Sequence, residues 1–403
     1  MQLSVLNISH VAANRHGAHA VEHQATVSDG GAVPRQLRFL IECETLSVSE
    51  IAPSPESFVL ALLPFCMQSG ADLACEHPVD EQLLYNINTQ LIPFLCTRYT
   101  GWRAIRVHAP TRSVDVPVSA TGLHALGMSC GLDALTAFAE LTGADAPREF
   151  KPEALLFNDI GAFGRGTEKR DHDLALVERF AAAHKLPLIR VTSNMGSFGG
   201  PHYTKTYSLR GAAVAWALKG LVRRVTYASG TDYAGLGHLD AMSDGGAFDP
   251  IVLPMMSSRS LDVYTSGFRH NRSDKFELLM QHPALIGYLN TCLRTVAGKG
   301  GYINCGTCKK CSELLFRAEA MGCMHALEPT FNVRAFKRLR TFLAFKLIYH
   351  AHMPSPSDNS VYTLQTLSKY KARLGVVPCL AGWLAAGFKW VKAGVSRAVN
   401  AEH

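Results

Sequence analysis

The sequence contains no long apolar run. Nowhere do about 18 uninterrupted apolar residues follow one another, as a membrane-spanning helix requires. No basic segment leads into an apolar stretch at residues 1–12, so we expect no secretory signal, and no internal repeat is visible. These absences favour a cytoplasmic protein, in which the eleven cysteines are expected to be reduced thiols.

Acidic residues are scarce in the last part of the chain. Residues 331–403 hold eleven Lys and Arg but only Asp358 and Glu402 as acids, while the whole chain has a net charge of +7. Such a region suits a nucleic-acid or protein partner or an anionic lipid, and it equally suits a solvated helix surface. Residues 379–399, with their aromatic and basic side chains, either pack on a partner subunit or rest on a membrane surface. We also expect a homo-oligomer.

Length and composition indicate a globular protein of two or three domains, with 403 residues, 47% hydrophobic and 18% charged. Residues 1–115 mix short strand-like runs with one helical pattern, which predicts an N-terminal α+β domain of unknown role. Strands are predicted at 37–43, 103–108 and 114–118, and a short helix at 58–67.

Residues 116–285 alternate short apolar strands with helical patterns, which predicts an α/β domain with a doubly wound parallel sheet. The expected strands are 123–128, 154–157, 188–192, 222–227 and 263–265, and the expected helices are 132–141, 171–184 and 209–219. Ligands of such sheets bind beyond the carboxyl ends of the strands. One shared edge is therefore predicted for the polar clusters that follow these strands: Ser129–Asp133, Asn158–Asp159, Ser193–Asn194 and Ser229–Asp232.

Residues 286–403 are predicted to form a helical, zinc-binding region that ends in a helix over 381–399, after a loop at 354–357. Four soft ligands suit a tetrahedral zinc ion without an open position, and they are Cys292, Cys305, Cys308 and Cys311. The alternative is a group of buried thiols, which is the preferred interpretation for the six scattered cysteines Cys43, Cys66, Cys75, Cys96, Cys323 and Cys379.

A small-residue loop, Ser129-Cys130-Gly131-Leu132-Asp133-Ala134, stands between a predicted strand and a predicted helix. The first N–H groups of a helix have no partner inside it, so a glycine turn at this place is a phosphate site in outline. The same residues also match Gly127-x-Ser129-x-Gly131, the nucleophile elbow of α/β hydrolases. An ordinary tight turn is the third interpretation.

The loop resembles the Ser-Gly-Gly-x-Asp-Ser loop of the N-type ATP pyrophosphatases, with Cys130 in place of a glycine and Ala134 in place of the last serine. Together with the downstream cysteines, it resembles the 7-cyano-7-deazaguanine synthase family over Leu123–Gly322. The gap from Cys292 to Cys305 is longer than is usual in that family. The resemblance implies a sheet of the adenine-nucleotide hydrolase type and a bound zinc ion.

The resemblance also implies an activity: with ATP and magnesium, a carboxylate is adenylated and then converted to an amide or a nitrile, with AMP and pyrophosphate released. It implies catalytic roles for Asp133, Arg272 and Lys275. The nucleotide-binding residues would be Ser129, Cys130, Gly131, Leu132, Asp133, Ala134, Asp159, Ser229, Gly230 and Asp232.

Three alternatives remain open at the level of the sequence. A thiolating enzyme of the same loop superfamily would modify tRNA and would make use of the basic C-terminal region. An α/β hydrolase would use Ser129 as its nucleophile. A non-catalytic nucleotide-binding protein would account for Cys130 and Ala134.

Overall fold

The computed structural model describes residues 2–15, 18–31, 33–113, 122–163, 167–236, 245–294, 300–353 and 358–401. The chain forms two compact units. The first consists of Met1–Ser129 and Ala137–Arg269, and the second consists of Cys130–Thr136 and His270–His403. Among the described residues, none of the helices has the length and apolar character needed to cross a membrane.

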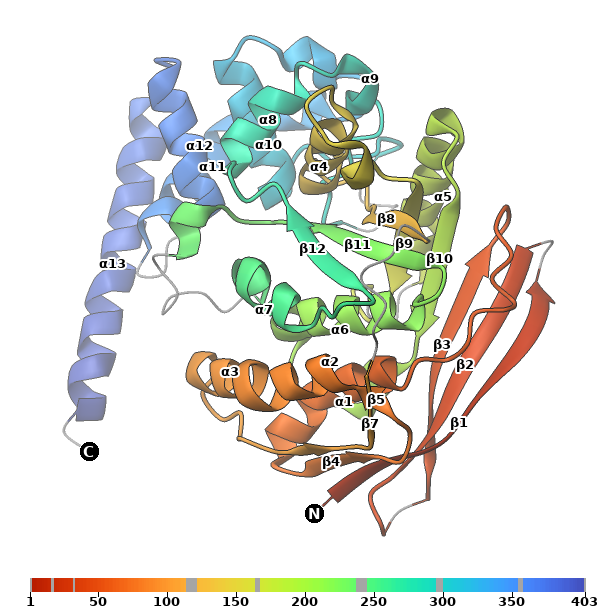
Figure 1. Cartoon of the computed structure of the whole chain (residues 1–403). Helices are drawn as coiled ribbons and strands as arrows, with labels where there is room; N and C mark the ends of the chain where they lie inside the picture. The colour runs from red at the N-terminus through yellow and green to blue at the C-terminus, as the bar shows by residue number, and fades with distance from the viewer. Residues whose placement is uncertain are drawn as a thin grey trace. The chain divides into compact units, whose positions relative to one another are not determined.

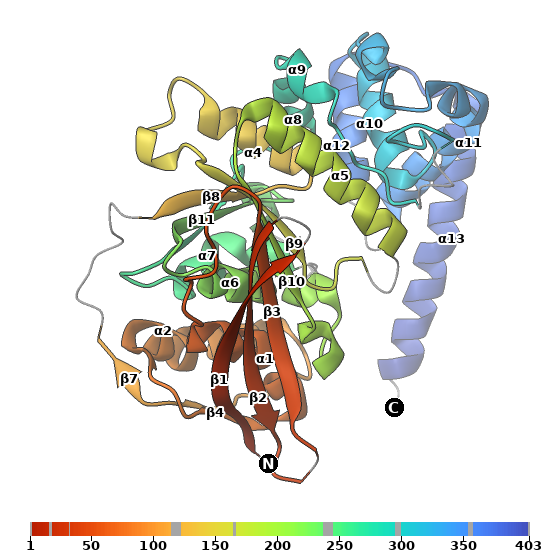
Figure 2. The same ribbon diagram turned by 90° about the vertical axis from the view of Figure 1, so that its right-hand side faces the viewer.

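The first unit is built on one ten-stranded, mostly parallel sheet, which confirms the α/β class (Figure 2). The strand order is β12-β11-β8-β9-β10-β3-β2-β1-β4-β6. The strands are β1 (Gln2–Arg15), β2 (Ala18–Ser28), β3 (Arg35–Cys43), β4 (Asp72–Cys75), β6 (Val107–His108), β8 (Leu123–Gly127), β9 (Ala154–Asp159), β10 (Leu188–Ser193), β11 (Val222–Ala228) and β12 (Asp262–Ser266). A separate pair is formed by β5 (Val79–Asp80) and β7 (Thr111–Arg112).

Strands β8 to β12 are mutually parallel and match the five strands predicted from apolar runs. The runs of β8 and β9 are continuous because strands covered on both faces bury successive residues, as β9 does from Ala154 to Phe157. Strand β3 follows the other pattern. It alternates exposed and buried residues, as predicted, with Phe39 and Ile41 among its buried side chains.

The N-terminal strands belong to the same sheet as the parallel strands, because β3 pairs antiparallel with β10 and Val191 lies opposite Ile41. The long hairpin of β1 and β2 extends the sheet beyond β3. The three predicted domain ranges stay a prediction. The boundary near residue 115 and the predicted strand at 114–118 lie largely outside the described residues.

Helices of the first unit cover this sheet. They are α1 (Pro55–Ser69), α2 (Glu81–Asn86), α3 (Ile92–Arg98), α5 (Thr167–His184), α6 (Tyr203–Ala217) and α7 (Asp249–Met255), with a π-helical segment at Ile87–Leu91 joining α2 to α3. The predicted helix at 58–67 lies inside α1, with Pro64 within it. Helices α1 and α6 pack on each other, and Trp216 of α6 is fully buried (Figure 1). The core therefore lies between the helices and the sheet.

The second unit is helical, as predicted for residues 286–403. It contains α8 (Arg272–Leu279), α9 (Pro283–Ile286), α10 (Lys309–Ala320), α11 (Val333–His352), α12 (Asp358–Lys369) and α13 (Val376–Ala401). Helix α4 (Leu132–Thr142) begins in this unit and continues into the first. Helix α13 contains the predicted range 381–399, and it packs along α11 (Figure 1). The loop predicted at 354–357 lies outside the described residues.

Candidate functional site

The loop after β8 has the backbone shape of a glycine turn. Cys130 has φ +55°, in the left-handed region that ordinary side chains rarely occupy, and its side chain is buried. Its carbonyl oxygen accepts a hydrogen bond from the Asn290 N–H at 2.8 Å. The Gly131 carbonyl accepts from the Leu135 N–H at 2.9 Å, which starts α4. Position 130 thus has a glycine-like backbone although it holds a cysteine.

The three predicted catalytic residues lie in contact. Arg272 Nη2 donates to Asp133 Oδ2 at 2.9 Å, and Lys275 Nζ donates to Asp133 Oδ1 at 3.1 Å. The Lys275 side chain is only 1% exposed, whereas those of Asp133 and Arg272 are 21% and 24% exposed. Burial alone would raise the pKa of the Asp133 carboxyl, but Arg272 and Lys275 hold that pKa below its ordinary value. Asp133 is therefore an anion that holds two cations together.

Helix α8 presents both cations from its first turn. The Asn271 side chain accepts from the N–H groups of Ser273 and Asp274, and Asp274 accepts from the Asn271 N–H, forming a capping box. Arg272 and Lys275 stand three positions apart, and such residues share one face of a helix. The carbonyl of Lys275 also accepts from Thr136 Oγ1 at 3.4 Å. The capping box thus fixes the direction in which the first turn of α8 presents Arg272 and Lys275.

The loop after β11 is closed by its own side chains. Ser229 is fully buried, donates from Oγ to the Thr231 carbonyl at 2.7 Å and accepts from the Thr231 N–H at 3.0 Å. Asp232 is 8% exposed and accepts from the Gly235 N–H at 3.1 Å. Hydrogen bonds between its own residues therefore hold this predicted nucleotide-binding loop as a turn. Gly230 is exposed between Ser229 and Thr231.

The ends of β8 and β11 are neighbours in the sheet. Their register pairs Leu126 with Thr226, so Ser129 and Ser229 each follow three residues later. Asp159 ends β9, the neighbour of β8 on the other side, and accepts from Arg170 Nη1 of α5 at 3.3 Å. The predicted clusters after β8, β9 and β11 thus follow adjacent strands.

The four predicted zinc ligands come together. The Sγ atoms of Cys292, Cys305, Cys308 and Cys311 all lie within 4.8 Å of one another. Thiolates bound to one tetrahedral zinc ion at about 2.3 Å lie just under 4 Å apart, so the group fits a single ion. Only Cys308 is not fully buried. The chemistry of four soft donors in a buried cluster therefore supports the predicted metal site.

Backbone N–H groups of the Cys305–Cys308 turn stabilise the thiolate form of Cys305. Cys305 Sγ accepts from the N–H groups of Thr307 at 3.5 Å and Cys308 at 3.2 Å. Hydrogen bonds from the Cys292, Cys308 and Cys311 thiols, and then the Thr307 N–H, lower the pKa of Cys305. Gly306 has φ +75°, and a Cβ there would come within 2.2 Å of the Asn332 carbonyl oxygen. Only glycine fits this turn.

Asn304 braces the cysteine cluster, although the sequence analysis did not single it out. Its side chain is fully buried, donates from Nδ2 to the Leu289 carbonyl at 2.7 Å and accepts at Oδ1 from the Thr291 N–H at 2.8 Å. Its own N–H donates to the Thr330 carbonyl at 2.9 Å. Asn304 therefore ties the segment before Cys292 to the segment before Cys305. Its position directly before the cysteine turn was the only signal in the sequence.

A second buried polar network joins α10 to α12 in the same unit. Arg317 is 1% exposed and donates from Nη2 to Oδ1 of Asn359 at 2.6 Å and to its carbonyl at 2.9 Å. Glu313, 2% exposed, accepts from the Asn359 amide and from Ser360 Oγ. Burial lowers the pKa of Arg317 to about 10, and Glu313 opposes that effect. The network holds the cysteine-bearing helix in place.

Several other residues of the first unit have structural roles. Asn194 accepts from the Arg38 N–H and donates to the Gln36 carbonyl, both at 2.8 Å, so it fastens the end of β10 to β3. His202 caps α6 by accepting from the Thr204 N–H. The glycine at 127 is required because a Cβ there would come within 2.8 Å of the Tyr227 ring.

The scattered cysteines split into two groups. Cys43, Cys66 and Cys75 are buried, which confirms the core interpretation for them. Burial raises the pKa of the Cys66 thiol to about 12, so it stays protonated at neutral pH. The other three, Cys96, Cys323 and Cys379, are only half-buried.

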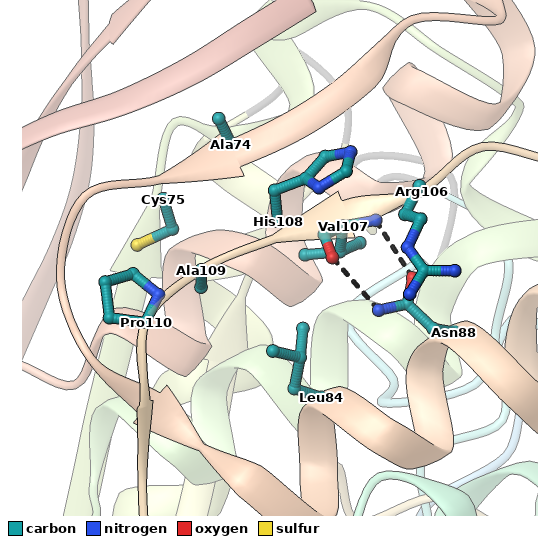
Figure 3. A pocket seen from close by; sticks show the side chains of 9 residues that line it. All are labelled: Ala74, Cys75, Leu84, Asn88, Arg106, Val107, His108, Ala109 and Pro110. Atoms are coloured by element: carbon teal, nitrogen blue, oxygen red, sulfur yellow. Dashed lines mark hydrogen bonds between the residues drawn. The ribbon is translucent and has the colours of Figure 1, made fainter.

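A hollow in the first unit is separate from the predicted residues (Figure 3). It is lined by backbone and side chains around β6, and Asn88 spans it by donating to the Val107 carbonyl at 3.0 Å and accepting from the Val107 N–H at 2.9 Å. None of the predicted site residues lines it. We interpret Asn88 as a brace for the short strand β6.

Comparisons with protein-family models, with curated proteins and with solved structures found no match to this chain. The family resemblance stated above therefore stays a prediction. So do the catalytic and nucleotide-binding roles of the named residues and the use of magnesium. The geometry adds that Asp133, Arg272 and Lys275 form one cluster and that the four cysteines form another.

Proposed function

We propose that this chain is an ATP-dependent ligase of the N-type ATP pyrophosphatase kind. It would adenylate a carboxylate, release pyrophosphate, and then pass the acyl group to an amine to give an amide and AMP. With ammonia as the amine, a second ATP would adenylate the amide oxygen, which would leave with AMP to give a nitrile. The observation that carries this proposal is the order of the parallel strands, β12-β11-β8-β9-β10, with glycine-containing loops after both β8 and β11.

We propose that the parallel strands form a doubly wound sheet, which the order of their addition supports. The chain adds β9 and β10 on one side of β8, and then adds β11 and β12 on the other side. In such sheets the ligand crevice lies at the carboxyl ends of the two strands where the direction of winding changes, because their loops leave towards opposite faces. In the proposed doubly wound sheet those strands would be β8 and β11, which Ser129 and Ser229 follow. Both loops contain residues predicted to bind the nucleotide.

The loop after β8 suits a phosphate ligand. Its left-handed turn at Cys130 leads directly into α4, and the N–H groups of a first helical turn attract anions. The left-handed φ of Cys130 also accounts for the glycine at this place in the ATP pyrophosphatase loop. The absence of a hydroxyl at Ala134 leaves the backbone donors in place.

The Asp133 cluster supplies positive charge for the transferred phosphate. Adenylation requires positioning and cations, because the triphosphate already contains its leaving group. In the proposed reaction a carboxylate oxygen attacks the α-phosphorus, the bond to pyrophosphate breaks, and an amine then displaces AMP from the acyl carbon. We assign to Arg272 and Lys275 the role of stabilising the negative charge of the phosphate. Asp133 would hold both side chains in position.

The four cysteines would hold a zinc ion in a structural role. All four ligand positions come from protein sulfur, so no position is open for substrate. When bound, the ion would link the segment containing Cys292 to the turn and helix that carry Cys305, Cys308 and Cys311. Cys311 lies in α10, the helix that contains Arg317.

The test is an incubation of the full chain with magnesium ATP, ammonia and a panel of carboxylates that includes 7-carboxy-7-deazaguanine, with AMP resolved from ADP. AMP that depends on one carboxylate supports the proposal. ATP binding without AMP from any carboxylate would favour the non-catalytic alternative, and labelling of Ser129 by a serine-directed probe without ATP would favour the hydrolase. Sulfur transfer to tRNA would favour the thiolating enzyme.

A matched pair of variants tests the assignment of the cluster. Asp133→Asn should abolish AMP formation, because it removes the anion between two cations. Glu277→Gln removes a half-buried carboxylate of the same helix, α8, whose partner is the exposed Lys369 at 2.8 Å, and should leave the rate unchanged. Equal rates in the two variants would refute the role of Asp133.

Cellular location, oligomeric state and macromolecular partner stay predictions. The sequence predicted a cytoplasmic homo-oligomer, with a nucleic-acid or protein partner at the basic C-terminal region.

A further inference from the structure

Over residues 376–389, helix α13 buries a stripe of small residues and exposes its large apolar ones. The stripe that faces α11 consists of Pro378, Gly382 and Ala386, all buried. A Cβ at Gly382 would lie 2.7 Å from Ile348 of α11, so close packing requires the small residue. This helix is therefore fixed to its unit by a narrow stripe, and its larger apolar side chains remain outside.

The outward face of α13 carries large apolar side chains over residues 376–389. They are Val376 (74%), Val377 (74%), Leu380 (61%), Trp383 (60%), Leu384 (67%) and Phe388 (77%), where the figures are exposed fractions. Contiguous exposed apolar groups of this size mark an interaction surface, because removing them from water is favourable in proportion to their area. The neighbouring helix α11 adds exposed Leu339 (38%) and Phe342 (52%).

The same two helices contain basic residues and no acidic ones. Helix α11 has five Lys and Arg, α13 has three, and neither contains Asp or Glu. Lys337, Arg338 and Lys389 are exposed. The Lys346 ammonium lies 5.0 Å from the centre of the Phe342 ring, so apolar and cationic groups adjoin on α11. A partner must therefore offer both an apolar layer and negative charge.

We propose that the surface formed by α11 and α13 binds the face of an anionic lipid bilayer. Large apolar side chains beside Lys and Arg are typical of helices that lie in the interface plane of a membrane. A second copy of this surface would bring like charges together, which disfavours self-association through it. Nucleic acid would satisfy the charge but not the aliphatic side chains Val376, Leu380 and Leu384, which can neither stack on bases nor bond to phosphate. The proposal is independent of the ligase function.

Co-sedimentation of the full chain with vesicles tests the proposal. We expect binding to phosphatidylcholine vesicles that contain phosphatidylglycerol, weaker binding to phosphatidylcholine alone, and a decline in binding with added salt. The double variant Leu384→Gln, Phe388→Gln should weaken binding by about tenfold or more for each side chain, because each loses an apolar group that enters the interface. The triple variant Lys337→Gln, Arg338→Gln, Lys389→Gln should weaken binding by about fivefold per residue.

A matched control distinguishes binding through this surface from nonspecific adsorption by exposed side chains. Tyr85→Gln removes a large side chain that is 63% exposed in the first unit, and it should leave vesicle binding unchanged. All variants change exposed residues, so their circular dichroism should match that of the wild type. Absence of wild-type binding to anionic vesicles at low salt would overturn the proposal. Equal losses of vesicle binding in the Tyr85 and Leu384–Phe388 variants would also overturn it. A third contradicting outcome is that the protein binds RNA but not vesicles, and that the Leu384–Phe388 variant still binds RNA.

Discussion

Replacing Asn304 by alanine should loosen the metal site without removing any of its ligands. The substitution deletes the amide that accepts from the Thr291 N–H and donates to the Leu289 carbonyl. Leu289 is fully buried and Thr291 half-buried, so one carbonyl and one N–H are left without their partner. At about 1–3 kcal/mol for each orphaned group, the second unit should lose about 3 kcal/mol of stability.

Zinc affinity should fall at the same time, by about 10- to 100-fold, because Thr291 directly precedes Cys292. The assay is competition for zinc between the protein and a chromogenic chelator of known affinity, followed by urea unfolding in the presence and absence of the ion. Metal binding is coupled to folding in sites of this kind, so the two losses should move together.

Asn88→Ala is the matched control for Asn304→Ala. Asn88 makes the same pair of bonds, to the carbonyl and the N–H of Val107, but in the first unit. It should lower stability by a similar or smaller amount, since Asn88 is only half-buried, and it should leave zinc affinity unchanged. The reasoning is refuted if Asn304→Ala binds zinc as tightly as the wild type, or if both variants lose zinc equally.

Cys308→Ser should lose stoichiometric zinc, measured by atomic emission, and should unfold at a lower urea concentration; full zinc content would contradict the four-cysteine site. Asp133→Asn should destabilise the second unit by about 3 kcal/mol in urea, because it leaves the buried Lys275 without its anion; a neutral effect would show that the pair does not stabilise the fold. Burial lowers the pKa of His124 to about 4, below the ordinary 6.5, so the unfolded chain takes up the proton first and stability should fall between pH 6.5 and 4. That loss is about 3 kcal/mol, and His124→Gln should remove it from the pH profile while leaving the similar loss due to His23, because burial also lowers the pKa of His23 to about 4.

Local sequence patterns predicted the alternating strands and helices of the parallel part of the sheet well. The strands β8 to β12 and the helices α1, α4, α5, α6 and α13 follow from short apolar runs and from helical periodicity, which depend only on neighbouring residues. The pairing of β3 with β10 was not predictable in this way, since nothing in residues 37–43 says which edge they will join. The long hairpin of β1 and β2 was also not predicted, because its alternation is irregular around a register shift between Leu6 and Ile8.

The cysteine cluster and the Asp133 cluster also differ in how far local sequence patterns could predict them. Three of the four metal ligands, Cys305, Cys308 and Cys311, lie within seven residues, so spacing alone predicted a site. The Asp133 cluster joins residues 139 and 142 positions apart, and the sequence could name its members but not their contact. Asn304 was missed because a buried asparagine and a solvated one look alike in sequence.

The sequence by itself determined the chemistry that the chain can offer: thiols at metal-ligand spacing, a small-residue loop between a strand and a helix, and a C-terminal region almost without acids. These features are local, so the spacing of neighbouring residues is enough to define them. Tertiary structure decided which groups meet. It paired Lys275 with Asp133 and placed the large side chains of α13 outside, because burial depends on what packs against each face.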